Sequence, residues 1–426
     1  MKWLESSGWD AEPENRAILR TRPSKATVCL TVGAAIDHQP DIGLVLSGGA
    51  SRGAYQAGVL RFIFRQLPKR LGYVPWPSVV SGTSVGALNG MFVVTRSERY
   101  LVYLSRIWRR MTVSDVFKIR ADDVIGALWG RYRGRPGAAL LDPSPLENLI
   151  RELFPVGETR EAIDSGKVRA FIACATDLAD GTNTLFLDTA DDSLDLRPLP
   201  GSRVIRHPAC PEMLLASAAI PFLFPPVQLC GRTFVDGGLR QNTPLRPVIQ
   251  SGVDRILMIG THAETAYQVR HAPDDDHDVV PTLAFLAGKS LNAIMADPVD
   301  RDLVNLERTN RFIDWGVREY GRTFADRIKQ DFNMRKVRML TIRPQMDLGA
   351  VANATYRAHP PTNDAASTRL LLNLMADSPN DAGGESDLLS YVYFDREFTG
   401  RIEAQGYEDA RQMEEELVRF FTEPVT

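Results

Sequence analysis

The sequence predicts an α/β protein with a three-layer α/β/α arrangement, a mostly parallel central sheet and additional helices. Strand-like and helix-like segments alternate from Ile42 to about Pro344 without an intervening linker, which favours one α/β domain. Two strand-like runs end in glycine-containing turns that lead at once into helix-like patterns. The 426 residues are 44% hydrophobic and 24% charged, an ordinary globular composition with ample material for a core.

The expected organisation is one central domain with an addition at each end. Residues 1–40 are predicted to form an N-terminal arm, residues 41–345 the α/β domain, and residues 346–426 a C-terminal extension with a linker and a terminal helix. Inside the central domain, residues 96–140 read as a basic and aromatic, cap-like insertion, and residues 262–313 as a loop followed by a helical region. No internal repeat is evident.

The first strand–turn–helix unit is the stretch around which the chain is organised. An apolar run over residues 42–46 ends at Gly48 and Gly49, and a helix-like pattern begins near Gly53. Glycines let the backbone approach a ligand closely, and the N–H groups at a helix start favour negative charge. Such a corner binds phosphates in nucleotide-binding proteins, holds oxyanions in acyl-transfer enzymes, or is a plain turn. This one matches neither nucleotide fingerprint.

A second unit carries a candidate nucleophile. Gly82-Thr83-Ser84-Val85-Gly86 follows a short β-prone run and precedes a small, apolar, helix-like segment. This context predicts a nucleophile elbow, in which Gly82 and Gly86 leave room for a strained turn that lifts the Ser84 hydroxyl toward a substrate. Because G-x-S-x-G alone is a weak signal in a chain with 32 glycines, the prediction depends on the β-prone run before the motif and the helix-like segment after it.

A serine hydroxyl needs a neighbouring base. Asp236 stands at the end of a β-prone run and is followed by Gly237 and Gly238, which let the chain turn at once. Because open α/β sheets bind ligands at such strand ends, Asp236 is the favoured base, although Asp-Gly-Gly is also an ordinary turn. Histidine is the usual base, and the six in this chain show no identifiable partner in the sequence: His38, His207, His262, His271, His277 and His359.

Together, the glycine corner with Arg52, the elbow at Ser84 and the turn at Asp236 resemble the motifs of patatin-like phospholipases, in the same order and rough spacing. The likeness spans about residues 42–260 and continues more loosely to residue 310. One departure is Ala50, where many members carry a third glycine. A left-handed backbone at that alanine would cost about 1 kcal/mol. Two further stretches are similar to that family, residues 216–226 and 242–244.

The resemblance implies a serine lipid acyl hydrolase that works through a Ser-Asp dyad without histidine. Ser84 would attack an ester carbonyl of a phospholipid or lysophospholipid, Asp236 would accept its proton, and an acyl-enzyme would form. Arg52 would steady the oxyanion loop or contact a lipid phosphate. Burial of the aspartate would raise its pKa usefully for a base. The oxyanion hole would be built around the backbone N–H groups of Gly48, Gly49 and Ala50.

Other functions stay open at this point. An acyltransferase would use the same dyad with an alcohol in place of water. A catalytically silent interaction protein could use the same fold, and a histidine-dependent α/β-hydrolase is less favoured. No metal or other cofactor is expected.

The remaining elements follow from periodicity and turn residues. Asn242 and Thr243 can cap a helix that begins near Pro244, and Gly252 can end it. Further core strands are expected at residues 168–175, 184–187, 255–260 and 337–342, and helices at residues 211–219, 244–252, 282–312 and 407–421.

The net charge of −3 conceals an uneven distribution. Residues 1–150 contain 20 Lys and Arg against 12 Asp and Glu, and arginines mix with aromatic residues from Arg96 to Arg135. This mixture suits a phospholipid interface, and it equally suits a solvated helix face over a buried aromatic stripe. We expect a lipid substrate and no nucleic-acid partner, and we leave a peripheral membrane contact and a homo-oligomer open.

Cysteine use and hydropathy bear on the compartment. The four cysteines form neither a metal-ligand pattern nor a disulfide framework, so buried free thiols in a reducing compartment are expected. The N-terminus lacks a signal-peptide core, and no run of 18 apolar residues could span a membrane. These observations predict a cytoplasmic protein, soluble or peripheral at a membrane. The cysteines are Cys29, Cys174, Cys210 and Cys230.

Overall fold

The structure is a computed structural model, and it describes residues 40–119, 139, 141–263, 299–332, 334–360, 366–376 and 387–424. The predicted N-terminal arm, most of the sequence from residue 120 to 140 and the loop after residue 263 lie outside these residues.

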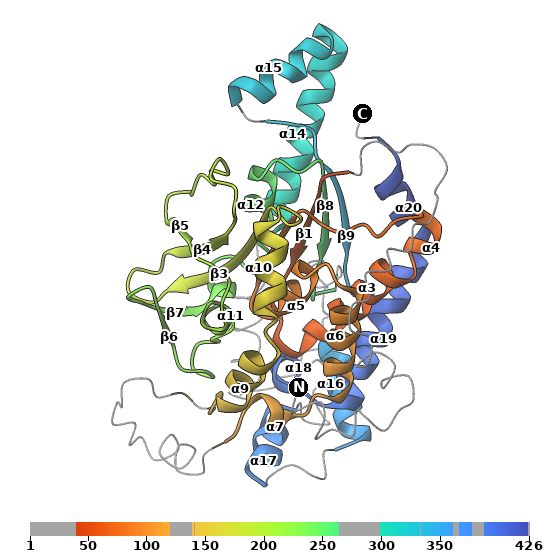
Figure 1. Ribbon diagram of the computed structural model, residues 1–426. Helices are drawn as coiled ribbons and strands as arrows, with labels where there is room; N and C mark the ends of the chain where they lie inside the picture. The colour runs from red at the N-terminus through yellow and green to blue at the C-terminus, as the bar shows by residue number, and fades with distance from the viewer. Residues whose placement is uncertain are drawn as a thin grey trace, which may run out of the picture.

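A mostly parallel sheet forms the centre of the molecule, as the sequence predicts (Figure 1). Its strand order is β5-β4-β3-β2-β1-β8-β9, and β7 pairs with β3 and with β6. The pairs β1–β2, β1–β8, β2–β3, β8–β9 and β4–β5 are parallel, whereas β3–β4, β3–β7 and β6–β7 are antiparallel. The strands are β1 Ile42–Leu46, β2 Val79–Thr83, β3 Ala170–Asp177, β4 Asn183–Asp188, β5 Ser202–Arg206, β6 Val227–Leu229, β7 Arg232–Asp236, β8 Arg255–Ile259 and β9 Arg338–Ile342.

Helices flank the sheet and fill the rest of the described chain (Figure 1). The first half holds η2 Ala50–Arg52, α3 Gly53–Arg65, α4 Pro68–Leu71, α5 Val85–Val94, α6 Glu98–Arg110, α7 Val113–Val116, α9 Ser144–Leu153 and α10 Val156–Asp164. The second half holds α11 Pro211–Ser217, η3 Gly237–Leu239, α12 Leu245–Gln250, α14 Val299–Tyr320, α15 Arg322–Phe332, α16 Leu348–Ala358, α17 Ala366–Met375, α18 Asp387–Val392, α19 Arg396–Gln412 and α20 Glu414–Thr422.

Alternating side chains along the strands build two hydrophobic cores. In β1, Leu44 and Leu46 belong to a core shared with α3, α5, α6 and α19, whereas Val45 faces a second core shared with α12 and α14. A strand residue and its neighbours point to opposite faces, so a continuous apolar run such as β1 is buried on both sides. The two cores make the three layers that the sequence predicts.

The C-terminal residues pack directly on the central domain. Helix α19 lies along α3, where glycines allow the backbones to touch: a Cβ at Gly58 would lie 1.8 Å from the carbonyl oxygen of Glu403. The Glu403 side chain is fully buried and accepts hydrogen bonds from Arg61, Ser105 and Arg109. Truncation of this segment would therefore expose α3 and leave the two arginines without their carboxylate partner.

Several local expectations are corrected by the structure. The helix after Pro244 has no side-chain cap, because the Thr243 hydroxyl pairs with that of Ser47 at 2.8 Å instead. The helix expected at residues 407–421 is two helices, which meet at Met413. Cys174 is buried as expected, whereas Cys210 is half-buried and Cys230 is exposed.

The described part of the basic and aromatic segment contains helices α6 and α7. Tyr103 and Trp108 point into the core, with 8% and 4% of their surface exposed, so these two rings do not face a lipid surface. Residues 120–138 of the segment lie outside the described residues. Among the described helices, none is both long and apolar enough to cross a membrane.

Candidate active site

Three turns meet at one edge of the sheet, and they are the three that carry the predicted site residues. The elbow follows β2 and the glycine corner follows β1, and these two strands are parallel neighbours. On the other side of β2, Thr83 pairs with Cys174 of β3, and the next β3 residue, Ala175, pairs with Asp236 of β7. The register of β2, β3 and β7 therefore places Ser84 and Asp236 close to each other at this edge of the sheet. Asp236 reaches it from an antiparallel strand, not from a parallel one.

Ser84 occupies a strained turn, as an elbow requires. Its backbone lies at φ 54° and ψ −126°, a conformation that a residue with a Cβ adopts only under constraint. The flanking glycines permit it, because a Cβ at Gly82 would lie 2.4 Å from the carbonyl carbon of Gly86 and one at Gly86 would lie 2.2 Å from Leu46 O. The Ser84 N–H donates to Ser217 Oγ (2.9 Å), whose hydroxyl donates to Cys174 O (2.6 Å). Ser217 thereby fixes the elbow.

Asp236 is completely buried, and this decides its electrostatics. Burial raises the pKa of its carboxyl to about 6, while the Ser84 hydroxyl and the Gly238 N–H act in the opposite direction. Oδ1 accepts the Gly238 N–H at 2.7 Å, whereas Oδ2 has no hydrogen-bond partner of good geometry among the described residues. The serine thus lies close enough to influence the carboxylate without closing a full hydrogen bond to Oδ2. Catalytic hydrogen bonds often tighten only when substrate binds.

At Gly237, as at Gly82 and Gly86, a Cβ atom would clash with neighbouring backbone. A Cβ at this position would lie 2.4 Å from the carbonyl oxygen of Cys174. The turn after Asp236 therefore passes against the backbone of β3, and only glycine fits there.

The glycine corner offers fewer free donors than its sequence suggests. The Gly48 N–H donates to Asn242 O at 3.0 Å, so it is already used. The N–H groups of Gly49 and Ala50 donate to no other described residue. Ala50 has φ 49°, the left-handed conformation anticipated for this position, and it lines the same pocket as Ser84. The left-handed backbone of Ala50 costs about 1 kcal/mol, and this strain lies at the pocket that Ser84 also lines.

Arg52 is held by the C-terminal part of the chain. Its side chain is buried, its Nε and Nη2 donate to Ser390 Oγ at 2.9 and 2.7 Å, and its guanidinium carbon lies 4.3 Å from the centre of the Tyr391 ring. The Ser51 hydroxyl donates to Ser390 O (2.5 Å). Helix α18 therefore clamps the corner, and of the two roles expected for Arg52 the geometry favours steadying the loop.

The far side of the corner is fixed by the end of β8. The Thr261 hydroxyl donates to Gly48 O, and His262 Nε2 pairs with the Tyr391 hydroxyl at 2.9 Å. A Cβ at Gly49 would lie 2.6 Å from Thr261 Oγ1. The corner is thus wedged between β8 and α18.

An apolar pocket opens beside Ser84. Its cavity volume is about 80 Å³, and apart from Ser84 and Asn89 its lining is hydrophobic. The lining comes from α5, α6 and α9, with Ala218, Ile220 and Phe224 from the segment before β6. Trp108 and Phe394 line it too and stack on each other, with ring centres 6.3 Å apart. A hydrocarbon chain suits such a pocket.

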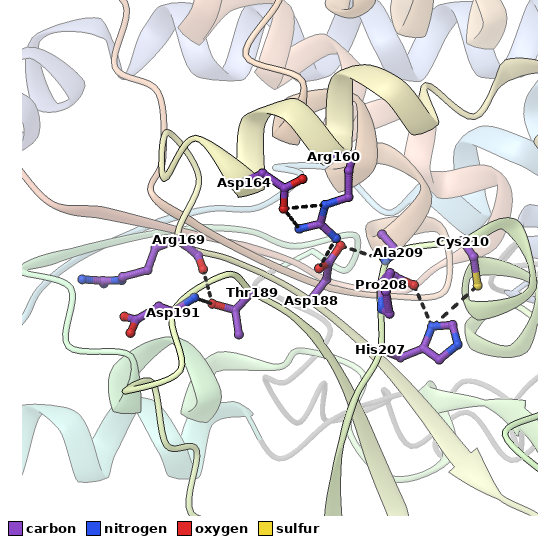
Figure 2. Close-up of polar contacts among 10 residues, drawn as sticks. All are labelled: Arg160, Asp164, Arg169, Asp188, Thr189, Asp191, His207, Pro208, Ala209 and Cys210. Carbon is purple, nitrogen blue, oxygen red and sulfur yellow. Dashed lines mark hydrogen bonds and ion pairs between the residues drawn. The ribbon is translucent and has the colours of Figure 1, made fainter.

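The described histidines are engaged elsewhere or exposed. Figure 2 shows His207 beside Pro208 and Cys210, with Nδ1 2.6 Å from Pro208 O and 3.9 Å from Cys210 Sγ. Burial raises the pKa of the Cys210 thiol, so this pair does not supply a thiolate nucleophile. His262 pairs with Tyr391, and His359 is exposed. His38, His271 and His277 lie outside the described residues.

Sequence reasoning missed the residues that position the site. Ser217 lies in a predicted helix that is similar to the phospholipase family but shows no sign of a role in the site. Ser390 and Tyr391 lie in the predicted C-terminal extension. A serine or tyrosine in an apolar helix carries no spacing that marks it as a partner of a distant arginine. The structure alone assigns these three residues to the site.

Comparison with known proteins is consistent with this geometry. Residues 44–249 match the family model of patatin-like phospholipase. A search of curated protein sequences finds no significant match.

Solved structures give more distant similarities. VipD from Legionella pneumophila is 13% identical over 89% of this chain and 67% of that chain, with a TM-score of 0.35. Human GIVD cytosolic phospholipase A2 is 12% identical over 92% of this chain and 61% of that chain, with a TM-score of 0.41. The type III effector protein ExoU is 13% identical, over 83% and 77%, with a TM-score of 0.26. The chain thus spans about three fifths of the length of the human enzyme and two thirds of VipD.

Proposed function

Since residues 44–249 belong to the patatin-like phospholipase family, we propose that this protein is a lipid hydrolase that cleaves fatty acyl esters of phospholipids or lysophospholipids. The observation that carries the proposal is the arrangement at the sheet edge. A serine on a strained elbow adjoins a buried carboxylate, two backbone N–H groups that donate to no other described residue, and an apolar pocket.

The proposed reaction begins with Ser84 as nucleophile. Its hydroxyl oxygen attacks the ester carbonyl while Asp236 Oδ2 accepts the proton, since this oxygen has no other partner among the described residues. The carbonyl oxygen becomes an oxyanion and accepts hydrogen bonds from the N–H groups of Gly49 and Ala50. Asp236 then returns the proton to the leaving alcohol. In the second half of the reaction, water attacks the acyl-serine while Asp236 accepts the proton of the water, and Asp236 then returns this proton to the Ser84 oxygen.

The perturbed acidity of Asp236 suits this role. An exposed aspartate with a pKa near 4 is a weak base, whereas burial raises the pKa of Asp236 to about 6. The carboxyl is then still ionised at neutral pH, and it accepts a proton more readily. The positioning residues Ser217, Ser390 and Tyr391 hold the elbow and the corner and do not touch the reacting atoms.

A single acyl chain would occupy the apolar pocket. Because its lining is almost wholly hydrocarbon, burying the chain would favour binding by about 25 cal/mol for each Å² removed from water. Phe222, with 91% of its surface exposed, lies in the short segment between the pocket residues Ile220 and Phe224. An exposed ring beside the pocket supports a peripheral contact with the lipid surface from which the substrate comes.

A fluorophosphonate probe tests the nucleophile. The wild-type protein should be labelled and Ser84→Ala should not be. The matched control is Ser81→Ala, because Ser81 is buried on the same strand and its hydroxyl has no described partner. Labelling of Ser84→Ala at the wild-type rate would refute the proposal. Mass spectrometry of products from phospholipid, lysophospholipid and neutral lipid panels would then identify the ester that is cleaved.

The two alternatives have separate signatures. An acyltransferase would be labelled in the same way, but an excess of acceptor alcohol would divert the acyl group from water to that alcohol. A silent interaction protein would show neither labelling nor turnover.

A further inference from the structure

A second cavity lies on the opposite face of the sheet from the acyl pocket. Its volume is about 290 Å³, many times the space that one water molecule needs. It is lined by the start of β4, the loop before β5, the residues after η3, α12 and Asp302 of α14. Leu185 of its lining belongs to the core under α12 and α14, whereas the acyl pocket is built from the other core. The elements that line it can be located in Figure 1.

Three arginines converge on this cavity from three different segments. Arg197 comes from the loop before β5, Arg240 from the turn after η3, and Arg246 from α12. Within the described part of the chain, none of their guanidinium groups has a hydrogen-bond or ion-pair partner. Arg197 and Arg240 are exposed, whereas Arg246 is half-buried and its Nε atom is fully buried, so bulk water does not satisfy this atom. A buried and unpaired cationic donor such as the Nε–H group of Arg246 is costly unless an anion binds to it.

Neutral polar side chains also line the cavity. Asn183 is 7% exposed, and its amide donates to Gln241 Oε1 at 2.8 Å while its own Oδ1 has no partner among the described residues. Rotating both amides by 180° reverses this bond and turns the Asn183 NH₂ group toward the unpartnered position. That group would then donate to an anion. Ser202 adds a hydroxyl to the same lining.

Asp302 contributes a carboxyl group to the cavity that the three guanidinium groups line. Burial raises the pKa of Asp302, and the charge of Arg246 acts in the opposite direction. The two side chains form no ion pair within 4.0 Å, so Asp302 does not neutralise Arg246 by contact. The cavity therefore keeps an excess of positive charge, which the charge of Asp302 reduces.

We propose that this cavity is a binding site for a phosphate group, held by Arg197, Arg240 and Arg246. Guanidinium groups match phosphate oxygens in pairs, and three of them from separate segments surround a tetrahedral dianion better than a planar carboxylate. The group belongs either to a soluble phosphate compound or to a lipid headgroup. Leu199, which is 45% exposed beside Arg197, lies where a lipid surface would meet the cavity rim.

Binding of inorganic pyrophosphate to the full-length protein tests the site without reference to catalysis. Isothermal titration should show saturable binding at low salt that weakens as salt is added. Arg246→Gln and Arg197→Gln should each weaken it about tenfold or more, since each removes a charge-assisted contact. Asp302→Asn should tighten it, a gain that damage to the fold would not produce. Arg401→Gln, an exposed arginine on α19, should leave it unchanged.

Vesicles then separate the two sources of the phosphate. Co-sedimentation with phosphatidylcholine vesicles that contain phosphatidylinositol 4-phosphate, lost in Arg246→Gln but not in Arg401→Gln, would assign a lipid headgroup. Pyrophosphate binding without such recruitment would assign a soluble phosphate compound. No binding of pyrophosphate by the wild-type protein would overturn the proposal. Equal binding by wild type and Arg246→Gln would overturn it too.

Discussion

Replacement of the buried carboxylate, Asp236→Asn, should abolish ester hydrolysis and at the same time stabilise the protein. The pKa of Asp236 rises from 3.8 to about 6 because burial disfavours the charged form. The folded state therefore binds this proton more tightly than the unfolded chain does. Below pH 3.8 the group is protonated in both states and costs nothing. As pH rises above that value the unfolded state gains from ionisation first, so the folded state loses relative stability until about pH 6.

The magnitude follows from the two acidities. One pKa unit is worth about 1.4 kcal/mol, so the ionised carboxylate costs roughly 3 kcal/mol at pH 7.5 and only about 1 kcal/mol at pH 4.5. An asparagine of the same shape does not ionise. The Asp236→Asn protein should therefore gain about 2 kcal/mol more over wild type at pH 7.5 than at pH 4.5.

Urea denaturation at the two pH values measures this difference, and a lipid ester assay measures the lost activity. The matched control is Asp177→Asn, another fully buried aspartate. Burial alone would raise the pKa of Asp177, but Arg232, the Ala179 N–H and Arg203 outweigh it and lower the pKa, so this substitution should destabilise the protein at pH 7.5. A pH-independent effect of Asp236→Asn on stability, or full hydrolytic activity, would refute the reasoning about the buried base.

Four further outcomes are expected. The kcat/KM of ester hydrolysis should rise with pH up to about 6 and level off above it, because the pKa of Asp236 is raised to about 6 and the base must be ionised; a fall across this range would contradict the assignment. Gly86→Ala should reduce kcat more than a hundredfold, whereas Gly157→Ala, at a position with open space and no positive φ, should not, as single-turnover kinetics would show. Ser390→Ala should lower kcat about tenfold with KM little changed, with Ser390→Thr restoring part of it, because the Arg52 guanidinium loses its acceptor; equal loss of kcat and folded protein would argue for a purely structural role. Phe222→Ser should weaken vesicle binding without changing turnover of a water-soluble ester, and unchanged co-sedimentation would remove Phe222 from the lipid contact.

Local signals in the sequence were sufficient for the fold class and for the three turns. The run that forms β1 and most of the run that forms β3 are apolar on both faces, and this marks them as buried strands of a parallel sheet. Gly86 lies in the predicted elbow, and Ala50 adopts a left-handed conformation at the position where many members of the similar family carry glycine. These features depend on residues close together in the chain.

Other features were misjudged because a side chain's competing partners lie far away in sequence. Thr243 looks like a helix cap, but its hydroxyl pairs with Ser47, 196 residues earlier. Gly48 looks like an oxyanion donor, but its N–H is taken by Asn242 O. The aromatic residues of α6 look suited to a lipid surface, yet Trp108 is buried and lines the apolar pocket beside Ser84. In each case a local pattern was correct about residue type and silent about the partner.

The sequence by itself determined most of the strands, though not β5 or β6, together with the turns and the chemical groups placed at the ends of β1, β2 and β7, since backbone geometry and side-chain periodicity act over a few residues. Only the tertiary structure decided how those groups are used. It buried Asp236 and so made it a stronger base, and it brought Ser390 to Arg52 across 338 residues. It also gathered three unpaired arginines around one cavity. Burial, desolvation and long-range pairing arise from the packing of distant segments, which no local pattern encodes.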